Sequence, residues 1–316
     1  MTRVAAIDCG TNSIRLLIAD VPAAGRAVDL LRRMEVVRLG QGVDATGRLA
    51  PEAVERTRVV LDEYAAQARE FGATEVRMVA TSATRDAANR ADFEDMVVAT
   101  LGRRPDVVSG TEEAELSYLG ATASLDVAAA AHGSPPPSPP FLVVDIGGGS
   151  TEFVLGDASG VRAARSVDIG CVRLTERHLH GDPPVPEEIA RTEADIRAAL
   201  ALVTAEVPVA DAGTLVGLAG SVTTVAALAL ELPGYDPAAI HGTRIAASDV
   251  RAVTADLLAA TRARRAAMPV MHPGRVDVIG AGSLILRELM DGFGFAEVVV
   301  SEHDILDGIA LRLARG

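Results

Sequence analysis

The sequence predicts an α/β protein built from two domains, and three observations carry this prediction. Short apolar runs rich in Val and Ile alternate with Ala- and Arg-rich stretches of helical length along the 316 residues, which is the pattern of an α/β fold. The segment FLVVDIGGGSTEFVLGD (141–157) repeats in outline VAAIDCGTNSIRLLIAD (4–20), and the proline-rich segment HGSPPPSPP (132–140) precedes this second copy. A chain of this length can bury two cores. We therefore expect a duplicated domain with a cleft between the copies.

The order of the elements follows from where β-rich runs and longer helical stretches occur. Runs of four to seven residues dominated by Val, Ile and Leu predict strands, and longer Ala-rich stretches predict helices. Pro51 and Pro186 stand where a proline suits the first turn of a helix. The expected strands are 4–8, 14–20, 76–80, 142–146, 153–156, 215–219, 276–279 and 298–301. The expected helices are 51–71, 92–101, 112–123, 186–206, 248–265, 282–293 and 305–315.

Proline marks the expected domain boundary. The prolines of 132–140 cannot continue a helix, so this segment is expected to be an extended connector. The first domain is then 1–131 and the second is 141–303.

Composition and charge exclude several classes of function. The formal net charge of −13 argues against binding of nucleic acid, whose phosphates most of the surface would repel. All 30 basic residues are arginine, which excludes a Walker lysine, a Schiff-base lysine and the lysine of protein kinases. Two cysteines are too few for a disulfide framework, and no charged-then-apolar leader opens the chain, so we expect a cytoplasmic protein. The uncharged stretch 212–230 is interrupted by Gly, Ser and Thr, and we do not expect it to span a membrane.

The two echoing segments share a glycine turn between two strands. Asp at the end of the first strand is followed by Gly two residues later and by Ser five residues later. The shared positions are Asp8 and Asp145, Gly10 and Gly147, and Ser13 and Ser150. An ordinary hairpin explains a single Asp-x-Gly. It explains DIGGGSTE (145–152) less well, because successive glycines expose consecutive backbone N–H groups, which form an anion-binding nest.

Two further glycine-containing segments resemble phosphate turns. In LAGSVTT (218–224) a strand is expected to pass through Gly220 and Ser221 into a helix, and IGAGSLI (279–285) has a similar pattern. Helix N-termini entered through glycine attract anions. Neither segment contains the G-x-G-x-x-G of a dinucleotide site. Beside the turn 147–149, Asp145 and Glu152 could hold a hydrated divalent cation.

These motifs resemble those of the actin, sugar kinase and Hsp70 superfamily, and more closely those of the exopolyphosphatase/guanosine pentaphosphate phosphohydrolase (Ppx/GppA) family. The resemblance rests on AIDCGTNSIRLLIAD (6–20), ATSATRDAAN (80–89), SGTEEAELSYLGA (109–121), VVDIGGGSTEFVLG (143–156), SVDIGCVRLTE (166–176), GLAGSVTTVAAL (217–228) and RVDVIGAGSLIL (275–286). It implies two ribonuclease-H-like domains, with the C-terminal helix near 304–316 returning to the first domain.

The segment SGTEEAEL (109–116) holds the candidate catalytic base. Taken alone, Glu112, Glu113 and Glu115 are acids near the start of a helix, where they favour the helix dipole. The resemblance implies that Glu113 is the base that removes a proton from the attacking water, with Asp145 and Glu152 as further catalytic residues.

The resemblance also implies the rest of the site. A cation, Mg²⁺ or Mn²⁺, is expected near Asp145 and Glu152, with Asp8 on the opposite wall. Arg85 either contacts phosphate oxygens or pairs with an acid of the first domain, and the sequence does not choose between these. The basic run Arg262, Arg264 and Arg265 is either a solvated face or a guide for a long anionic substrate. The expected phosphate-binding residues are Gly10, Thr11, Asn12, Ser13, Arg85, Gly147, Gly148, Gly149, Ser150, Gly220 and Ser221.

The function implied by this resemblance is exopolyphosphatase activity, the release of terminal phosphate from inorganic polyphosphate. Hydrolysis of pppGpp to ppGpp is the alternative within the family. A superfamily kinase, or a non-catalytic sensor of polyphosphate or of ppGpp, is a further alternative. Longer family members carry extra helical domains that are not expected here, so we expect a preference for short chains and a homodimer that extends the groove.

Overall fold

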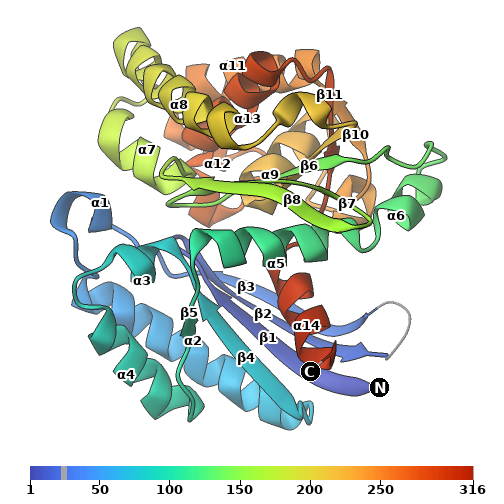
Figure 1. The fold of residues 1–316 in the computed structure, drawn as a ribbon. Coiled ribbons are helices and arrows are strands. Elements are labelled where there is room, and N and C mark those ends of the chain that lie inside the picture. The colour runs from blue at the N-terminus through green and yellow to red at the C-terminus, as the bar shows by residue number, and fades with distance from the viewer. Residues whose placement is uncertain (23–26, 316) are drawn as a thin grey trace. The chain divides into compact units, whose positions relative to one another are not determined.

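The structure, a computed structural model, describes residues 1–22 and 27–315 and divides into two compact units (Figure 1). Unit 1 comprises Met1–Ala123 and Asp304–Gly316, and unit 2 comprises Ser124–His303. Unit 2 is therefore an insertion within the sequence of unit 1. The proline-rich segment 132–140 lies in unit 2, after helix α6 (Leu125–Ala131).

Unit 1 is built on a five-stranded sheet in the order β3-β2-β1-β4-β5. Strands β1, β2 and β3 form an antiparallel meander, and β4 and β5 continue the sheet parallel to β1. The strands are β1 (Thr2–Cys9), β2 (Ser13–Val21), β3 (Val28–Val36), β4 (Glu75–Ala80) and β5 (Asp106–Val107). The helices are α1 (Val43–Thr46), α2 (Pro51–Glu70), α3 (Ser82–Asp86), α4 (Arg90–Leu101), α5 (Gly110–Thr122) and α14 (Ile305–Arg315).

Both faces of this sheet are covered, because alternate residues of β1 enter different cores. Ala5 and Ile7 pack in a core with residues of α2 and α4. Val4 and Ala6 pack in a second core with residues of α5 and α14. Helices α5 and α14 approach closely at a glycine contact: a Cβ on Gly120 would lie 1.8 Å from the Asp304 carbonyl oxygen. The C-terminal helix is thus part of the first unit.

Unit 2 is built on a six-stranded sheet in the order β10-β11-β9-β6-β7-β8. The strands are β6 (Phe141–Ile146), β7 (Thr151–Asp157), β8 (Gly160–Val167), β9 (Thr214–Leu218), β10 (Arg244–Ala246) and β11 (Glu297–Val300). Besides α6, the helices are α7 (Cys171–His178), α8 (Pro186–Glu206), α9 (Ala219–Ala229), α10 (Pro237–Ile240), α11 (Ala247–Ala259), α12 (Arg262–Ala266) and α13 (Ile279–Phe293). Two 3₁₀ turns, η1 (Val209–Asp211) and η2 (Pro273–Arg275), complete the unit.

The two sheets share one topology. The order β8-β7-β6-β9-β11 repeats β3-β2-β1-β4-β5, with the same antiparallel meander followed by two parallel strands. This repetition confirms the prediction of a duplicated α/β protein with two ribonuclease-H-like domains.

Two element predictions were wrong. The segment 276–279 is no strand: Val276 is helical (φ −48°, ψ −42°), and Ile279 begins α13. The single helix expected at 248–265 is divided into α11 and α12, because Ala260 is extended (φ −80°, ψ 138°) and Thr261 caps α12 by accepting a hydrogen bond from the Arg264 N–H.

Within the described ranges 1–22 and 27–315, every helix is too short or too polar to cross a bilayer. The uncharged stretch 212–230 forms β9 and α9 around the core of unit 2.

Candidate phosphate-binding and catalytic site

The first glycine turn joins β1 to β2 and is fixed by its carbonyl groups. The Gly10 N–H donates to the Ser13 carbonyl (N···O 3.0 Å), which closes the turn. The carbonyls of Thr11 and Asn12 accept hydrogen bonds from backbone N–H groups of the neighbouring segment 37–40 (N···O 2.8–3.1 Å). In a trans peptide the C=O and the following N–H point in opposite directions. The N–H groups of Asn12 and Ser13 are therefore directed away from this segment.

The second glycine turn, between β6 and β7 of unit 2, is closed in the same way, but its carbonyls have different partners. It is closed by a hydrogen bond from the Gly147 N–H to the Ser150 carbonyl (N···O 3.1 Å). Its carbonyls face the first turn of α7. The bonds are Cys171 N–H to Gly147 O (3.0 Å), Val172 N–H to Gly148 O (2.9 Å) and Arg173 Nε to Gly149 O (2.7 Å). The peptide N–H groups of 148–150 are therefore directed away from α7.

These two turns have the donors that a phosphate needs. Among the described residues, none accepts a hydrogen bond from the backbone N–H of Asn12, Gly148 or Gly149. A short row of N–H groups pointing the same way is an anion-binding nest. Close packing holds the second nest, because a Cβ on Gly170 would lie 2.3 Å from the Gly148 carbonyl oxygen.

The acidic residues beside the two turns differ in their cross-strand partners. Asp8 lies opposite Arg15 in the β1–β2 register, whereas Asp145 lies opposite Glu152 at the equivalent position of β6–β7. Cross-strand neighbours on one face have Cβ atoms about 5 Å apart, and like charges there are destabilising. One Glu152 carboxylate oxygen accepts a hydrogen bond from the Ser166 hydroxyl (O···O 2.8 Å). Unit 2 therefore carries the acidic pair, and unit 1 carries an ion pair in its place.

Asp8 is buried, with one oxygen bonded and the other orphaned. Its Oδ2 accepts from Arg15 Nη2 (2.6 Å) and Nε (3.0 Å), and Arg15 also pairs with Asp304. Its Oδ1 has no hydrogen-bond partner among the described residues. Burial raises the pKa of Asp8 above its ordinary value, against the opposing effect of Arg15. Asp304 comes from the segment that precedes α14, so the C-terminal segment helps to organise the first turn.

Glu113 and Arg85, both predicted site residues, form an ion pair within unit 1. Ser109 caps α5 by accepting from the Glu112 N–H, which places Glu113 in the first turn of the helix with a side chain only 10% exposed. Arg85 Nη1 donates to Glu113 Oε2 (3.1 Å) and to the Val108 carbonyl (3.1 Å). Of the two alternatives for Arg85, pairing with an acid of the first domain is thus realised, and this contact orients the Glu113 carboxylate.

The third turn leads from β9 into α9 and holds an arginine that the sequence analysis missed. Ala219 has a left-handed backbone (φ +68°), and such strain in a non-glycine residue is concentrated at functional sites. A Cβ on Gly220 would lie 2.4–2.5 Å from the Arg275 guanidinium. Arg275 donates to the Thr224 hydroxyl (N···O 3.1 Å) and lies over the Tyr235 ring. Glycine at 220 therefore admits a guanidinium to the entrance of α9.

The fourth predicted turn and the basic run have structural roles. The segment 279–285 lies within α13, and a Cβ on Gly282 would lie 2.2 Å from the Ser221 hydroxyl, so this glycine allows close packing. Arg265 is buried and donates to the carbonyls of Val276 and Ala260, and Arg262 pairs with Asp277. The hypothesis that this run guides a long substrate is therefore wrong for Arg265.

Neither cysteine is suited to nucleophilic chemistry. Cys9 and Cys171 are free and buried. Burial raises the pKa of both thiols above the ordinary value, and a buried neutral thiol is inert.

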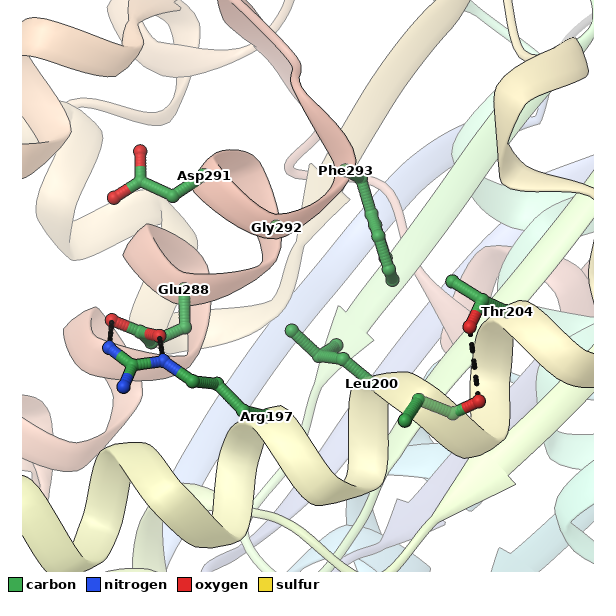
Figure 2. Close-up of a pocket in the computed structure, with 8 residues that line it drawn as sticks. Arg197, Leu200, Thr204, Glu288, Asp291, Gly292 and Phe293 are labelled. Atoms are coloured by element: carbon green, nitrogen blue, oxygen red, sulfur yellow. Dashed lines mark hydrogen bonds and ion pairs between the residues drawn. The ribbon is translucent and has the colours of Figure 1, made fainter.

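In unit 2 a separate pocket of about 480 Å³ opens between α8 and α13 (Figure 2). Leu200 and Phe293 line its apolar side, and Arg197 pairs with Glu288 at its edge (Nε···Oε2 2.7 Å). It contains none of the predicted site residues. Across the described ranges, no three His, Cys, Asp or Glu side chains form a group able to hold a metal ion.

Sequence reasoning missed Arg15, Arg173 and Arg275, which all contact a glycine turn or its flanking acid. Arg15 carried a local signal, since it stands at the position of Glu152 in the repeat. Arg173 and Arg275 carried none, because the turns they contact lie 24 and more residues away along the chain.

Comparisons with known proteins agree with this geometry. Residues 17–315 match the Ppx/GppA phosphatase family. Exopolyphosphatase 2 of Mycobacterium tuberculosis is 52% identical over 326 aligned positions, which cover 99% of each chain. The crystal structure of an exopolyphosphatase-like protein superposes with a TM-score of 0.92 at 42% identity over 99% of both chains. A Ppx/GppA family member from Aquifex aeolicus superposes with a TM-score of 0.77 at 31% identity, over 98% of this chain and 97% of that one. This chain belongs to the Ppx/GppA phosphatase family.

Proposed function

We propose that this protein is an exopolyphosphatase, which hydrolyses the terminal phosphoanhydride bond of inorganic polyphosphate and releases orthophosphate. We also propose that units 1 and 2 are its two domains. The observation that carries the proposal is the pair of glycine turns closed by equivalent hydrogen bonds, whose free N–H groups suit phosphate oxygens. The relative from M. tuberculosis, named exopolyphosphatase 2, supports polyphosphate as the substrate class.

In the proposed reaction, Glu113 takes a proton from water as the water oxygen attacks the terminal phosphorus. The new P–O bond forms as the bridging P–O bond breaks, and the shortened chain leaves with its electron pair. Phosphoryl transfer depends on positioning and on neutralising charge. The turns 10–13 and 147–150 supply backbone N–H donors that position the phosphate. Arg275, which lies beside the Gly220–Ser221 turn, supplies a further cationic contact.

The side chains present suit a hard divalent cation such as Mg²⁺. Carboxylate oxygens are its preferred protein ligands, and it is commonly held by one or two carboxylates together with water and substrate phosphates. Asp145 and Glu152, opposed across two strands, would hold it, and the orphaned Oδ1 of Asp8 is a further candidate. The bound cation would neutralise charge on the phosphate oxygens. Mn²⁺ has similar ligand preferences.

The test compares phosphate release from polyphosphate and from pppGpp by the purified protein with Mg²⁺. We expect release from polyphosphate. Turnover of pppGpp alone would instead make the protein a pppGpp phosphohydrolase. Transfer of phosphate from ATP to a sugar would indicate a kinase, and binding of polyphosphate or ppGpp without turnover would indicate a sensor.

Three further properties belong to this proposal. We propose that short chains are preferred, that the protein acts as a homodimer, and that it is cytoplasmic, since both cysteines are free thiols. Equal rates on short and very long chains would contradict the first property, and a monomeric mass by light scattering would contradict the second.

A further inference from the structure

Arg275 differs from Arg15 and Arg85, two other half-buried arginines of the predicted site, in having no acidic partner among the described residues. Arg15 and Arg85 each pair with a carboxylate. Within residues 1–22 and 27–315, no carboxylate lies at ion-pair distance from Arg275, whose one hydrogen bond goes to the neutral Thr224 hydroxyl. No direct ion pair therefore neutralises its positive charge within the described residues.

The guanidinium of Arg275 lies close to both Gly220 and the Tyr235 ring. The missing Cβ of Gly220 leaves the space that the guanidinium fills. The Arg275 Cζ also lies 5.8 Å from the centroid of the Tyr235 ring. An aromatic face attracts a cation without cancelling its charge. A carboxylate in the same place would fix the arginine equally well but would compete with an incoming phosphate.

Tyr235 is itself anchored at its hydroxyl. This oxygen lies 2.6 Å from the Thr223 hydroxyl oxygen and 2.6 Å from Oε1 of Glu302. Because the carboxylate can only accept, the phenol donates to Glu302 and accepts from Thr223. Burial, followed by the charge of Glu302, raises the pKa of the Tyr235 phenol, which keeps it protonated as a donor. Thr223 and Thr224 are consecutive in α9, so ring and guanidinium are fixed to the same helix.

We propose that Tyr235 is a positioning residue, which holds the Arg275 guanidinium at the glycine entrance of α9 and thereby sets the affinity for the phosphate groups of the substrate. Tyr235 does not touch the phosphate in this assignment. Its loss is expected to weaken substrate binding while leaving the chemical step nearly unchanged. The inference depends on the proposed function for its kinetic readout.

The experiment compares Tyr235→Leu, which removes the ring, with Tyr235→Phe, which removes only the hydroxyl anchor. The measured quantities are kcat and KM for phosphate release from polyphosphate. For Tyr235→Leu we expect KM to rise about three- to thirtyfold, with kcat within about threefold of the parent. For Tyr235→Phe we expect a smaller rise in KM, about two- to threefold, because the aromatic ring beside Arg275 remains.

Coupling to Arg275 separates positioning from a merely structural role. In an Arg275→Gln background, Tyr235→Leu is expected to raise KM by less than about twofold, since the group that it positions is gone. The matched control is Arg33→Gln. Arg33 also lies over a tyrosine ring (5.4 Å to the centroid of Tyr64), but it pairs with Glu35 and Glu63. This control is expected to leave both kinetic constants unchanged.

Direct binding keeps this inference separable from the proposed function. Binding of tripolyphosphate to the Glu113→Gln protein is measured by calorimetry, with and without Tyr235→Leu, and the dissociation constant is expected to rise by the same factor as KM. If the parent protein releases no phosphate from polyphosphate, the proposed function fails, and this binding comparison still tests the role of Tyr235. The inference is overturned if Tyr235→Leu leaves KM and the dissociation constant unchanged. It is also overturned if the effects of Tyr235→Leu and Arg275→Gln multiply independently, or if the Glu113→Gln protein binds no tripolyphosphate.

Discussion

Replacement of Glu113 by Gln tests the proposed base with little disturbance of the structure. Gln has nearly the same shape and keeps a carbonyl oxygen that can accept from Arg85 Nη1, which also remains bonded to the Val108 carbonyl. The exchange replaces the ion pair by a hydrogen bond from the Arg85 guanidinium to a neutral amide oxygen, which costs about 1 kcal/mol of the free energy of unfolding. The melting temperature is therefore expected to fall by only about 2–4 °C.

The catalytic effect of the same substitution is expected to be much larger. A positioned general base contributes about 10²–10⁴-fold to a rate, so kcat for phosphate release should fall by about this factor, with the dissociation constant for tripolyphosphate nearly unchanged. Phosphate release is followed with a colorimetric phosphate assay, and binding by calorimetry.

Glu112 provides the control, because it is the adjacent acid in the same helical turn. It pairs with Arg77 (Oε1···Nη2 2.9 Å) and its side chain is 37% exposed. Glu112→Gln should retain kcat within about twofold. The reasoning is refuted if Glu113→Gln keeps kcat within about threefold of the parent, or if Glu112→Gln loses as much activity as Glu113→Gln.

Four further outcomes are expected. Gly170→Ala places a Cβ 2.3 Å from a carbonyl oxygen of the second turn, so phosphate release should be strongly reduced; an unaltered kcat/KM would contradict the role of this turn. Gly120→Ala forces a Cβ to within 1.8 Å of the Asp304 carbonyl oxygen and should cost about 1–3 kcal/mol or more in urea unfolding; an unshifted urea midpoint would show that the helices can separate freely. The hydrogen bond from His178 lowers the pKa of Asp195, and Arg177 adds to this effect against the opposing effect of burial. The ionised Asp195 therefore stabilises the fold above its unfolded-state pKa, and this stabilisation is lost as the pH falls through the folded-state pKa. The Asp195→Asn protein should have a lower melting temperature than the parent at neutral pH but not in acid. Chelation with EDTA should abolish phosphate release and added Mg²⁺ should restore it, whereas activity that persists in EDTA would exclude a required divalent cation.

Local patterns were sufficient for most of the buried elements. Helix α8 begins at Pro186 and ends at Glu206, as its apolar periodicity and first-turn proline predicted. The edge strands β3 and β8 were missed, because arginines interrupt their apolar runs and their outer residues are exposed. The false strand at 276–279 contains β-branched residues, which are typical of strands, but the preceding 3₁₀ turn carries them into a helix.

For the site, the repeat predicted both glycine turns and the position of Asp8 and Asp145, because these features are written in consecutive residues. The hydrogen bonds that orient the turns could not be predicted from neighbouring residues in the sequence. The carbonyls of the second turn are fixed by α7, and Arg275 reaches α9 from 51 residues further along the chain. Such contacts depend on tertiary packing, which a window of neighbouring residues does not contain.

The insertion of unit 2 within unit 1 has a consequence for deletions. The hydroxyl of Ser124 lies 3.0 Å from Nδ1 of His303, so the first and last residues of unit 2 meet. Removal of everything after His303 would leave unit 2 whole. The same truncation would remove Asp304, the ion-pair partner of Arg15. It would also remove α14, which covers one face of the unit 1 sheet. Loss of residues 304–315 is therefore expected to destabilise the first glycine turn and the strands beside it, about 290 residues earlier in the sequence.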